Sequence, residues 1–275
     1  MMRTQLLKKQ TALLLSCAAL LGTLTACKQK QVVLENGGAD GQVIGSDQIL
    51  NYTLPEKGEE IVLMTIRDYG DVKIKLFPEQ CPKGVENFKK LVETGFYDEL
   101  IFHRVVDGFV IQGGDPRGDG TGGVDAWGSQ EGFAQTISPH LCHVTGALAY
   151  AIGQDKLNKS QFYIVTGEEV TPELFGVLRD QYGKTFTPEV EALYQQSGGQ
   201  PFLDGGYEVF GQVFDGLDKC LEIQKVAVNS ETSKPKSAVV IEKAVIAEYD
   251  GEPPHYLNAA GEELQIGSSG LNDEG

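Results

Sequence analysis

The chain has 275 residues, of which 41% are hydrophobic and 23% charged, as in a soluble globular protein with its own core. Acidic residues outnumber basic ones by 39 to 23, which gives a net charge of -16. That balance argues against nucleic-acid binding, because a phosphate backbone requires a clustered Lys/Arg surface, and against polybasic attachment to a membrane surface. The five cysteines show no Cys-x-x-Cys spacing, so neither a disulfide-rich scaffold nor a structural zinc site is indicated.

Residues 1–26 are typical of a signal peptide. Three basic residues, Arg3, Lys8 and Lys9, precede an apolar run of about 14 residues that is too short to span a bilayer as a helix. The run ends in Leu-Thr-Ala before Cys27, which resembles the lipobox of bacterial lipoproteins, in which the first mature residue is a lipid-bearing cysteine. The alternative is an ordinary secretory signal with an incidental cysteine.

Acylation at Cys27 would anchor the protein durably, because two or more acyl chains hold where one is marginal. We therefore expect an extracytoplasmic protein, lipid-anchored to the bacterial cell membrane. Cys17 would leave with the signal peptide, so three cysteines remain in the body: Cys81, Cys142 and Cys220. They form either one disulfide with a spare thiol or, as their apolar neighbours favour, three separate buried thiols.

Two segments flanking the body show no sustained periodicity. Residues 27–58 are polar and rich in glycine, which predicts a flexible spacer. Residues 250–275 are acidic with interspersed Gly and Ser, which predicts a solvated, disordered tail. The core is therefore expected within residues 59–249.

The body opens with a predicted hairpin. Apolar residues alternate over 62–66 and again over 72–76, on either side of a polar turn at 68–71. A helix follows, with Pro82 in its first turn, an apolar face through Phe88 and Leu91, and Gly95 at a left-handed C-terminal cap.

Short apolar runs cut by glycine dominate the remaining chain. They cover residues 102–112, 146–152, 162–166, 207–214 and 239–247, with a helical pattern over 217–226. Many short strands with few helices predict a mainly β sandwich or barrel.

Three motifs carry a family resemblance. Residues 102–115 read FHRVVDGFVIQGGD and strongly resemble the signature of cyclophilins, the peptidyl-prolyl cis-trans isomerases. Residues 158–164 (NKSQFYI) and 202–213 (FLDGGYEVFGQV) resemble two further family motifs in the family's order. The resemblance implies a closed eight-stranded antiparallel barrel capped by two helices.

The implied reaction is rotation about an X-Pro bond, whose barrier of about 18–20 kcal/mol makes uncatalysed exchange slow. The reaction breaks no bond, so it requires no nucleophile, cofactor or metal. A donor aimed at the prolyl nitrogen localises its lone pair and favours the twisted state. Arg104, which matches the family's catalytic arginine, offers a rigid and permanently charged fork for this role. The alternative is an arginine in a surface ion pair.

The resemblance also implies a set of substrate contacts. Gln112 is expected to act with Arg104, and Gln161 to bind substrate or orient the arginine. Ala151 and Ile152 match the segment that pairs with the peptide backbone. The remaining expected contacts form the proline pocket and its rim: Phe109, Val110, Tyr163, Phe202, Leu203 and Tyr207. Plain barrel core is the alternative for these apolar positions.

Several positions depart from the family pattern. Val110 replaces a Met, Tyr163 a Phe, Phe202 a Trp and Tyr207 a His, while Ile152 stands where Asn is usual. The Tyr163 hydroxyl requires a partner or water, and Phe202 lacks the indole N–H that supports cyclosporin binding in the family. We therefore expect weak inhibition by that drug.

Residues from about 167 to 201 add a segment that typical members lack. Two Thr-Pro-Glu triplets, at 171–173 and 187–189, each predict a helix start with an N-cap, a proline and an acid. A helical pair flanking the cleft is our hypothesis, and a decoration remote from the chemistry is the alternative.

Two functions remain open from the sequence. The first is an active isomerase that assists the folding of exported or cell-surface proteins, acting as a monomer on proline-containing peptides. The second is a proline-peptide-binding or chaperone module with little activity. The spacing of His140, Cys142 and His143 matches no common metal site, so no metal is expected.

Overall fold

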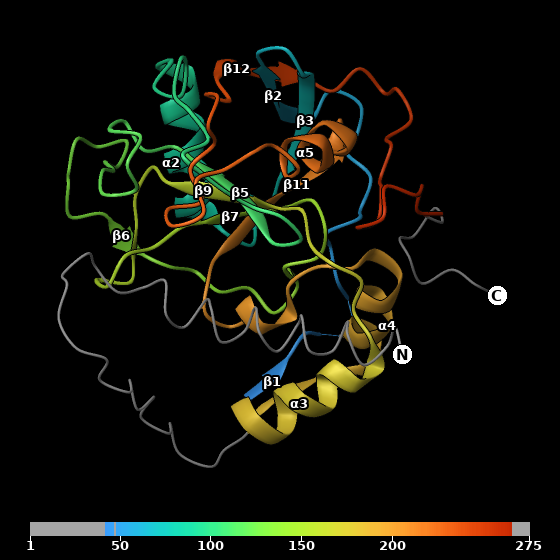
Figure 1. The fold of residues 1–275 in the computed structure, drawn as a ribbon. Helices are drawn as coiled ribbons and strands as arrows, with labels where there is room; N and C mark the ends of the chain where they lie inside the picture. The colour runs from blue at the N-terminus through green and yellow to red at the C-terminus, as the bar shows by residue number, and fades with distance from the viewer. Residues whose placement is uncertain (1–41, 47, 266–275) are drawn as a thin grey trace, which may run out of the picture.

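The computed structural model describes residues 42–46 and 48–265, and one curled antiparallel sheet forms the centre of the fold (Figure 1). Its eight strands follow the order β12-β2-β3-β11-β7-β9-β5-β4. Their bounds are β2 (Glu60–Ile66), β3 (Gly70–Leu76), β4 (Arg104–Val106), β5 (Val110–Gly113), β7 (Ala147–Tyr150), β9 (Phe162–Val165), β11 (Val209–Asp215) and β12 (Ile241–Glu248). Two short strands, β6 (Phe133–Ala134) and β8 (Leu157–Asn158), pair separately.

The predicted closed barrel is wrong in one respect, because the sheet does not close. Its edge strands β4 and β12 do not pair with each other. The N–H of Val105 in β4 instead donates to the carbonyl of Ser233 in a loop, over 2.8 Å. An isolated bridge between Ile101 and Val240, with backbone hydrogen bonds beside it, joins the segments that precede the two edge strands. The result is an open, curled half-barrel.

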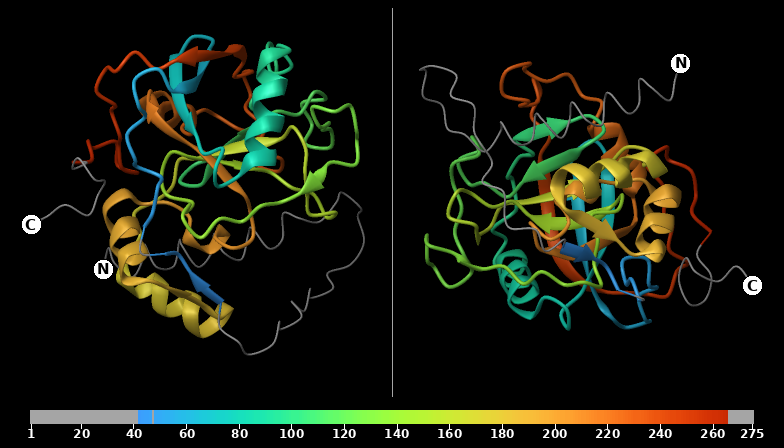
Figure 2. Two further views of the ribbon diagram at one scale, coloured as in Figure 1. Left: turned by 180° about the vertical axis from the view of Figure 1, so that it is seen from behind. Right: turned by 90° about the horizontal axis from the view of Figure 1, so that it is seen from below.

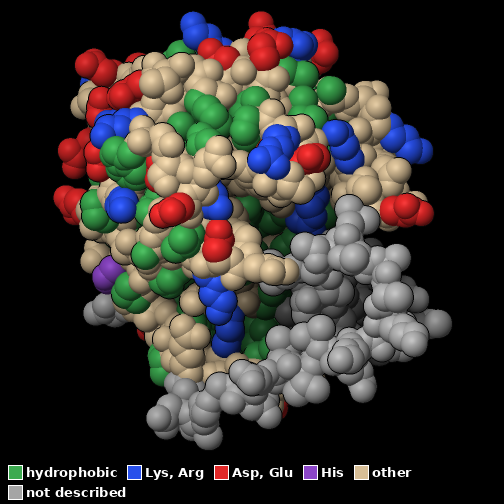
Figure 3. Space-filling view, turned by 90° about the vertical axis from the view of Figure 1, so that its left-hand side faces the viewer, with side chains coloured by type: hydrophobic (Ala, Val, Ile, Leu, Met, Phe, Trp, Pro, Cys, Tyr) green, Lys and Arg blue, Asp and Glu red, His purple; other side chains and the backbone are tan. Residues whose placement is uncertain are grey.

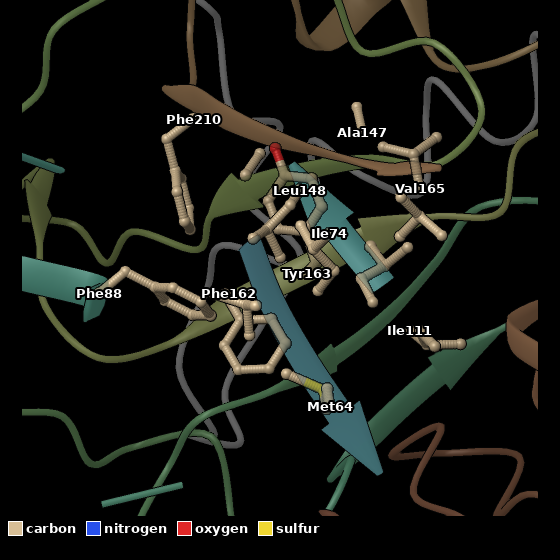
Figure 4. Packing of buried hydrophobic residues seen from close by; sticks show 14 of the residues in the cluster. Met64, Ile74, Phe88, Ile111, Ala147, Leu148, Phe162, Tyr163, Val165 and Phe210 are labelled. Carbon is tan, nitrogen blue, oxygen red and sulfur yellow. The ribbon is translucent and has the colours of Figure 1, made fainter. Parts of the chain in front are cut away.

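The predicted hairpin is present as β2 and β3. In both strands buried residues alternate with more exposed ones, so that every second side chain enters the core. Asp68 and Gly70 have φ values of 68° and 103°, which the tight turn between the strands requires. Figure 4 shows part of the core, where Phe88 and Phe162 meet edge to face with ring centroids 5.6 Å apart.

Two helices pack against the sheet (Figure 2). α2 (Pro82–Glu93) starts with the predicted proline and buries Val85, Phe88, Leu91 and Val92 on one face. Gly95 follows it with φ 68° and donates its N–H to Val92, as the cap prediction required. α5 (Leu217–Ile223) buries Leu217, Cys220 and Ile223.

The inserted segment folds as two helices joined by a strand. These are α3 (Pro172–Tyr182), β10 (Lys184–Phe186) and α4 (Pro188–Ser197), which lie to one side of the sheet in Figures 1 and 2. At α4 the Thr187 hydroxyl accepts from the N–H of Val190, the capping contact that the Thr-Pro-Glu pattern predicts. Gly183, with φ 65°, ends α3.

The insertion packs into a second hydrophobic cluster that residues before and after the body complete. Leu174, Phe175, Phe186 and Leu193 of the insertion lie in this cluster with other buried side chains, among them Ile44, Tyr52, Val144, Phe214, Tyr249 and Tyr256. Each large apolar side chain contributes roughly 1.5–3 kcal/mol on burial, so this packing fixes the insertion on the body.

The spacer and tail predictions are therefore wrong where the structure describes those segments. β1 (Gln42–Ile44) pairs in parallel with β10, and Asn51 is fully buried, with hydrogen bonds to Cys142 and Gln212. The Tyr256 ring meets Tyr52 edge to face at 5.1 Å. Polar composition misled both predictions, because a few apolar residues in each segment suffice to dock it.

The three body cysteines are separate, buried thiols, as their apolar neighbours favoured. In the described part of the chain no helix is long and apolar enough to cross a membrane. The predicted signal peptide and the predicted lipid attachment site at Cys27 lie outside the described residues.

Candidate active site

Three neighbouring strands bring the predicted catalytic residues onto one face. Arg104 of β4 lies opposite Gln112 of β5, and Gln112 lies opposite Tyr163 of β9. Directly opposed residues of antiparallel strands project to the same side of the sheet. Residues separated by 59 positions in the chain therefore form one row, which places an arginine, an amide and a phenol side by side.

Arg104 is half-buried at the start of β4. Its Nη1 lies 3.4 Å from Oε1 of Gln112, and its guanidinium carbon lies 5.5 Å from the centre of the Phe109 ring. The amide and the aromatic face hold the guanidinium by hydrogen bonding and by cation–π attraction. The arginine is therefore oriented beside an aromatic ring and within reach of the Gln112 amide.

Gln112 and Gln161 continue this arrangement as a relay. Nε2 of Gln112 donates to Oε1 of Gln161 over 2.9 Å, and Nε2 of Gln161 donates to the carbonyls of Gly120 and Gly122 at 3.1 and 2.6 Å. Each amide is fixed by its neighbour, so the acceptor that faces Arg104 has a defined orientation. The glycine-rich loop after β5 thus serves as the fixed end of the relay.

Four aromatic side chains form what we call the aromatic cluster: Phe109, Tyr163, Phe202 and Tyr207. Phe109 and Phe202 stack with ring centroids 5.8 Å apart, and Tyr163 and Tyr207 meet edge to face at 6.2 Å. Phe109 and Tyr163 are each 5% exposed, whereas Phe202 and Tyr207 are half-buried. The cluster presents apolar ring surface next to the Arg104 guanidinium.

The other predicted contacts lie around this cluster. Val110 shares the face of β5 that carries Gln112, and both Val110 and Leu203 are buried. Ala151 and Ile152 follow β7 and are half-buried. The N–H of Ala151 donates to the backbone carbonyl of Gln161. The 151–152 segment is therefore hydrogen-bonded to a residue of the relay.

Two buried polar residues that the sequence did not assign to the site complete the cluster. Oδ1 of Asp204 accepts from the backbone N–H of His143 at 2.8 Å and lies 2.6 Å from its Nδ1. Nε2 of His143 lies 3.0 Å from the Tyr163 hydroxyl, which is the partner that this hydroxyl requires. Because a carboxylate only accepts, Nδ1 carries the hydrogen, and in the neutral ring Nε2 accepts from Tyr163.

Gly205 allows a close approach at the same turn. Its φ is 76°, and a Cβ there would lie 2.4 Å from Nε2 of Gln42 in β1. The start of the described chain therefore lies against the turn that carries Phe202 and Leu203.

The surroundings of His103, the residue before Arg104, disfavour a positive charge on its ring. Burial lowers the pKa of the neighbouring His103, and the Arg104 charge lowers it further. His103 is 5% exposed. On the face drawn in Figure 3, acidic and basic side chains are intermingled rather than segregated.

The fold and the row of Arg104, Gln112 and Tyr163 define a class of enzyme. Residues 61–246 match the model of the cyclophilin type peptidyl-prolyl cis-trans isomerase family, and the chain belongs to that family. The protein is a peptidyl-prolyl cis-trans isomerase.

Its relatives include staphylococcal proteins named for the same activity. One from Staphylococcus saprophyticus is 37% identical over 191 residues, which cover 70% of this chain and 94% of the relative. One from Staphylococcus aureus strain USA300 is 39% identical over 189 residues, which cover 69% and 93%.

Solved structures agree with this assignment. A cyclophilin-type isomerase from Cryptosporidium parvum, determined in the presence of the dipeptide Ala-Pro, is 30% identical and superposes with a TM-score of 0.53. The match covers 69% of this chain and 99% of that one. The same parasite protein in a second structure gives a TM-score of 0.54.

Proposed function

We propose that this isomerase binds proline-containing segments on the aromatic cluster and catalyses rotation with Arg104. The observation that carries the proposal is the guanidinium of Arg104 held between Oε1 of Gln112 and the ring of Phe109. The Cryptosporidium structure, determined with Ala-Pro, supports a proline-containing ligand.

The chemistry follows from the donor and the apolar rings. As the X-Pro bond twists, the prolyl nitrogen loses conjugation and becomes a better hydrogen-bond acceptor, so a donor placed there stabilises the transition state more than the ground state. Arg104 supplies that donor, with Gln112 fixing its direction. Phe109, Val110, Tyr163 and Leu203 hold the ring while the carbonyl side turns.

The remaining contacts orient the chain of the substrate. Gln161 and the 151–152 segment bind the peptide backbone, and Phe202 with Tyr207 forms the rim. No covalent intermediate is required, because the reaction is a rotation.

A protease-coupled assay on a tetrapeptide with one X-Pro bond tests the proposed site. Removing a preorganised donor costs about a hundredfold in rate, so Arg104→Ala should lose at least that much of kcat/KM. Arg179→Ala is the matched control, because Arg179 lies exposed on α3 beside Asp180. Equal activity of wild type and Arg104→Ala would contradict the proposed role of Arg104.

We further propose that the enzyme works outside the cytoplasm, as a monomer, on exported or cell-surface proteins while anchored by lipid at Cys27. The support is the sequence pattern of residues 1–27. Labelling of growing cells with a fatty-acid probe should mark the wild type and not Cys27→Ala, and the variant should move from the membrane to the soluble fraction. An unlabelled wild type would contradict the anchor.

A further inference from the structure

The turn that carries Phe202 and Leu203 receives direct support from the inserted segment. Nζ of Lys184 in β10 donates 2.6 Å hydrogen bonds to the carbonyl oxygens of Phe202 and Asp204. The Phe202 ring packs against both hydrophobic clusters, so it joins the core of the curled sheet to the insertion. Burial lowers the pKa of Lys184, and the Asp204 carboxylate opposes that shift. A partly desolvated ammonium on two carbonyls is a strong local restraint.

Helix α4 reaches the same turn through Tyr194. Its hydroxyl donates to Oδ2 of Asp204 over 2.6 Å. Burial and the neighbouring carboxylate raise the pKa of Tyr194, so the hydroxyl keeps its proton. The other carboxylate oxygen holds His143, which in turn holds the Tyr163 hydroxyl. Four buried side chains therefore connect α4 to the aromatic cluster without a gap.

We infer that Lys184 and Tyr194 are positioning residues of the active site, through which the insertion fixes the Phe202–Asp204 turn and the Tyr163 ring. The inference rests on the proposed site. It makes the inserted segment a working part of the proline-binding surface, because hydrogen bonds that lead to the insertion hold both the turn that carries Phe202 and the hydroxyl of Tyr163.

The expected kinetic signature is specific. The aromatic cluster holds the proline ring in both the ground state and the transition state, so loosening it weakens binding uniformly. Loss of uniform binding raises KM and leaves kcat nearly unchanged. Loss of the Arg104 donor instead lowers kcat, so the two kinds of defect are distinguishable.

A double-mutant cycle tests the path from Tyr194 to Tyr163. Residues in one hydrogen-bond network give non-additive effects, whereas remote ones add. We expect Tyr194→Phe to raise KM by roughly threefold or more in the wild type and to have little effect once Tyr163→Phe has removed the last link. Tyr256→Phe is the control, because it also removes a buried hydroxyl, one that donates to the Thr53 carbonyl.

Two substitutions of Lys184 test its hydrogen bonds to the Phe202–Asp204 turn. Lys184→Met should raise KM, and Lys184→Arg should restore part of the loss, because it returns a charged donor. Lys75→Met is the matched control, since Nζ of Lys75 also donates to a backbone carbonyl, that of Leu54, at 2.9 Å. Urea unfolding of every variant separates a loss of stability from a loss of substrate binding.

The results of these experiments either support or overturn the positioning role. The positioning role is overturned if Tyr194→Phe and Lys184→Met leave KM where Tyr256→Phe and Lys75→Met leave it, or if the effects of Tyr194→Phe and Tyr163→Phe simply add. If Arg104→Ala keeps full activity, the proposed site fails and the positioning role is rejected with it. A raised KM with coupling to Tyr163 supports the inference.

Discussion

Oε1 of Gln112 faces the guanidinium of Arg104 across the β4–β5 ladder, with 3.4 Å between it and Nη1. Gln112 accepts from the arginine while donating to Gln161. Only a side chain with both an acceptor and a donor can serve both neighbours.

This double role predicts the effect of a carboxylate at the position. Gln112→Glu should lower kcat by about tenfold or more, because the new charge would hold the guanidinium away from the substrate and leave Oε1 of Gln161 without its donor. The tetrapeptide assay measures the effect. Gln195→Glu, on the exposed side of α4, is the control, and equal rates for the two variants would contradict the relay.

Cyclosporin sensitivity should depend on residue 202. Phe202 stacks on Phe109 but offers no indole N–H to the drug. Phe202→Trp should therefore strengthen inhibition by about tenfold, the value of one net hydrogen bond of about 1.4 kcal/mol. Inhibition constants measured beside Tyr182→Trp, an exposed position on α3, provide the comparison. An unchanged constant would show that the missing donor is not what limits the drug.

Glu208 should make stability depend on pH. Burial raises its pKa from 4.5 to about 7, against hydrogen bonds from the Thr136 N–H and the Asn158 amide. The native state then binds this proton more tightly than the unfolded chain does. The free energy of unfolding therefore falls as the pH rises from about 4.5 to about 7, and its contribution is fully present only below that window.

Glu208→Gln removes this titration. Relative to wild type, the variant should gain about 3 kcal/mol between pH 4 and pH 8, at about 1.4 kcal/mol for each pKa unit. Urea unfolding at both pH values measures it. Glu86→Gln, at an exposed helix position paired with Lys90, should leave the wild-type pH dependence intact. Parallel profiles for wild type and Glu208→Gln would refute the assignment.

The three body cysteines should be inert in the folded protein. Burial raises the pKa of the Cys220 thiol to about 12 and raises those of Cys81 and Cys142 as well, and the reactive species is the thiolate. A soluble form starting after Cys27 should therefore react with a thiol reagent only on unfolding, and then at all three positions. Fast labelling of the native protein would contradict this expectation.

Local patterns predicted much of the fold. The alternation over β2 and β3, the Pro82 start of α2 and the Thr187 cap of α4 all act over a few residues, so they are legible in the sequence. The open edge between β4 and β12 was not predictable, because it depends on a contact between Val105 and Ser233, 128 positions apart.

In the candidate site, too, local motifs were predictable and long-range contacts were not. Arg104 and Gln112 stand in a recognisable motif, and strand register alone brings them together. Tyr194 and Lys184 lie outside the three motifs, and only the folded structure shows that both contact Asp204. Their only sequence signal was a tyrosine and a lysine near the predicted helices, which is too common to indicate a role.

The parallel pairing of β1 with β10 has a mechanical consequence. Gln42 enters the folded domain against Gly205 and beside the strand that carries Lys184. A pull exerted from upstream would be transmitted first to that two-stranded ladder, in shear, and from there to the turn bearing Phe202. Tension applied there would thus reach the aromatic cluster before it reached the eight-stranded sheet.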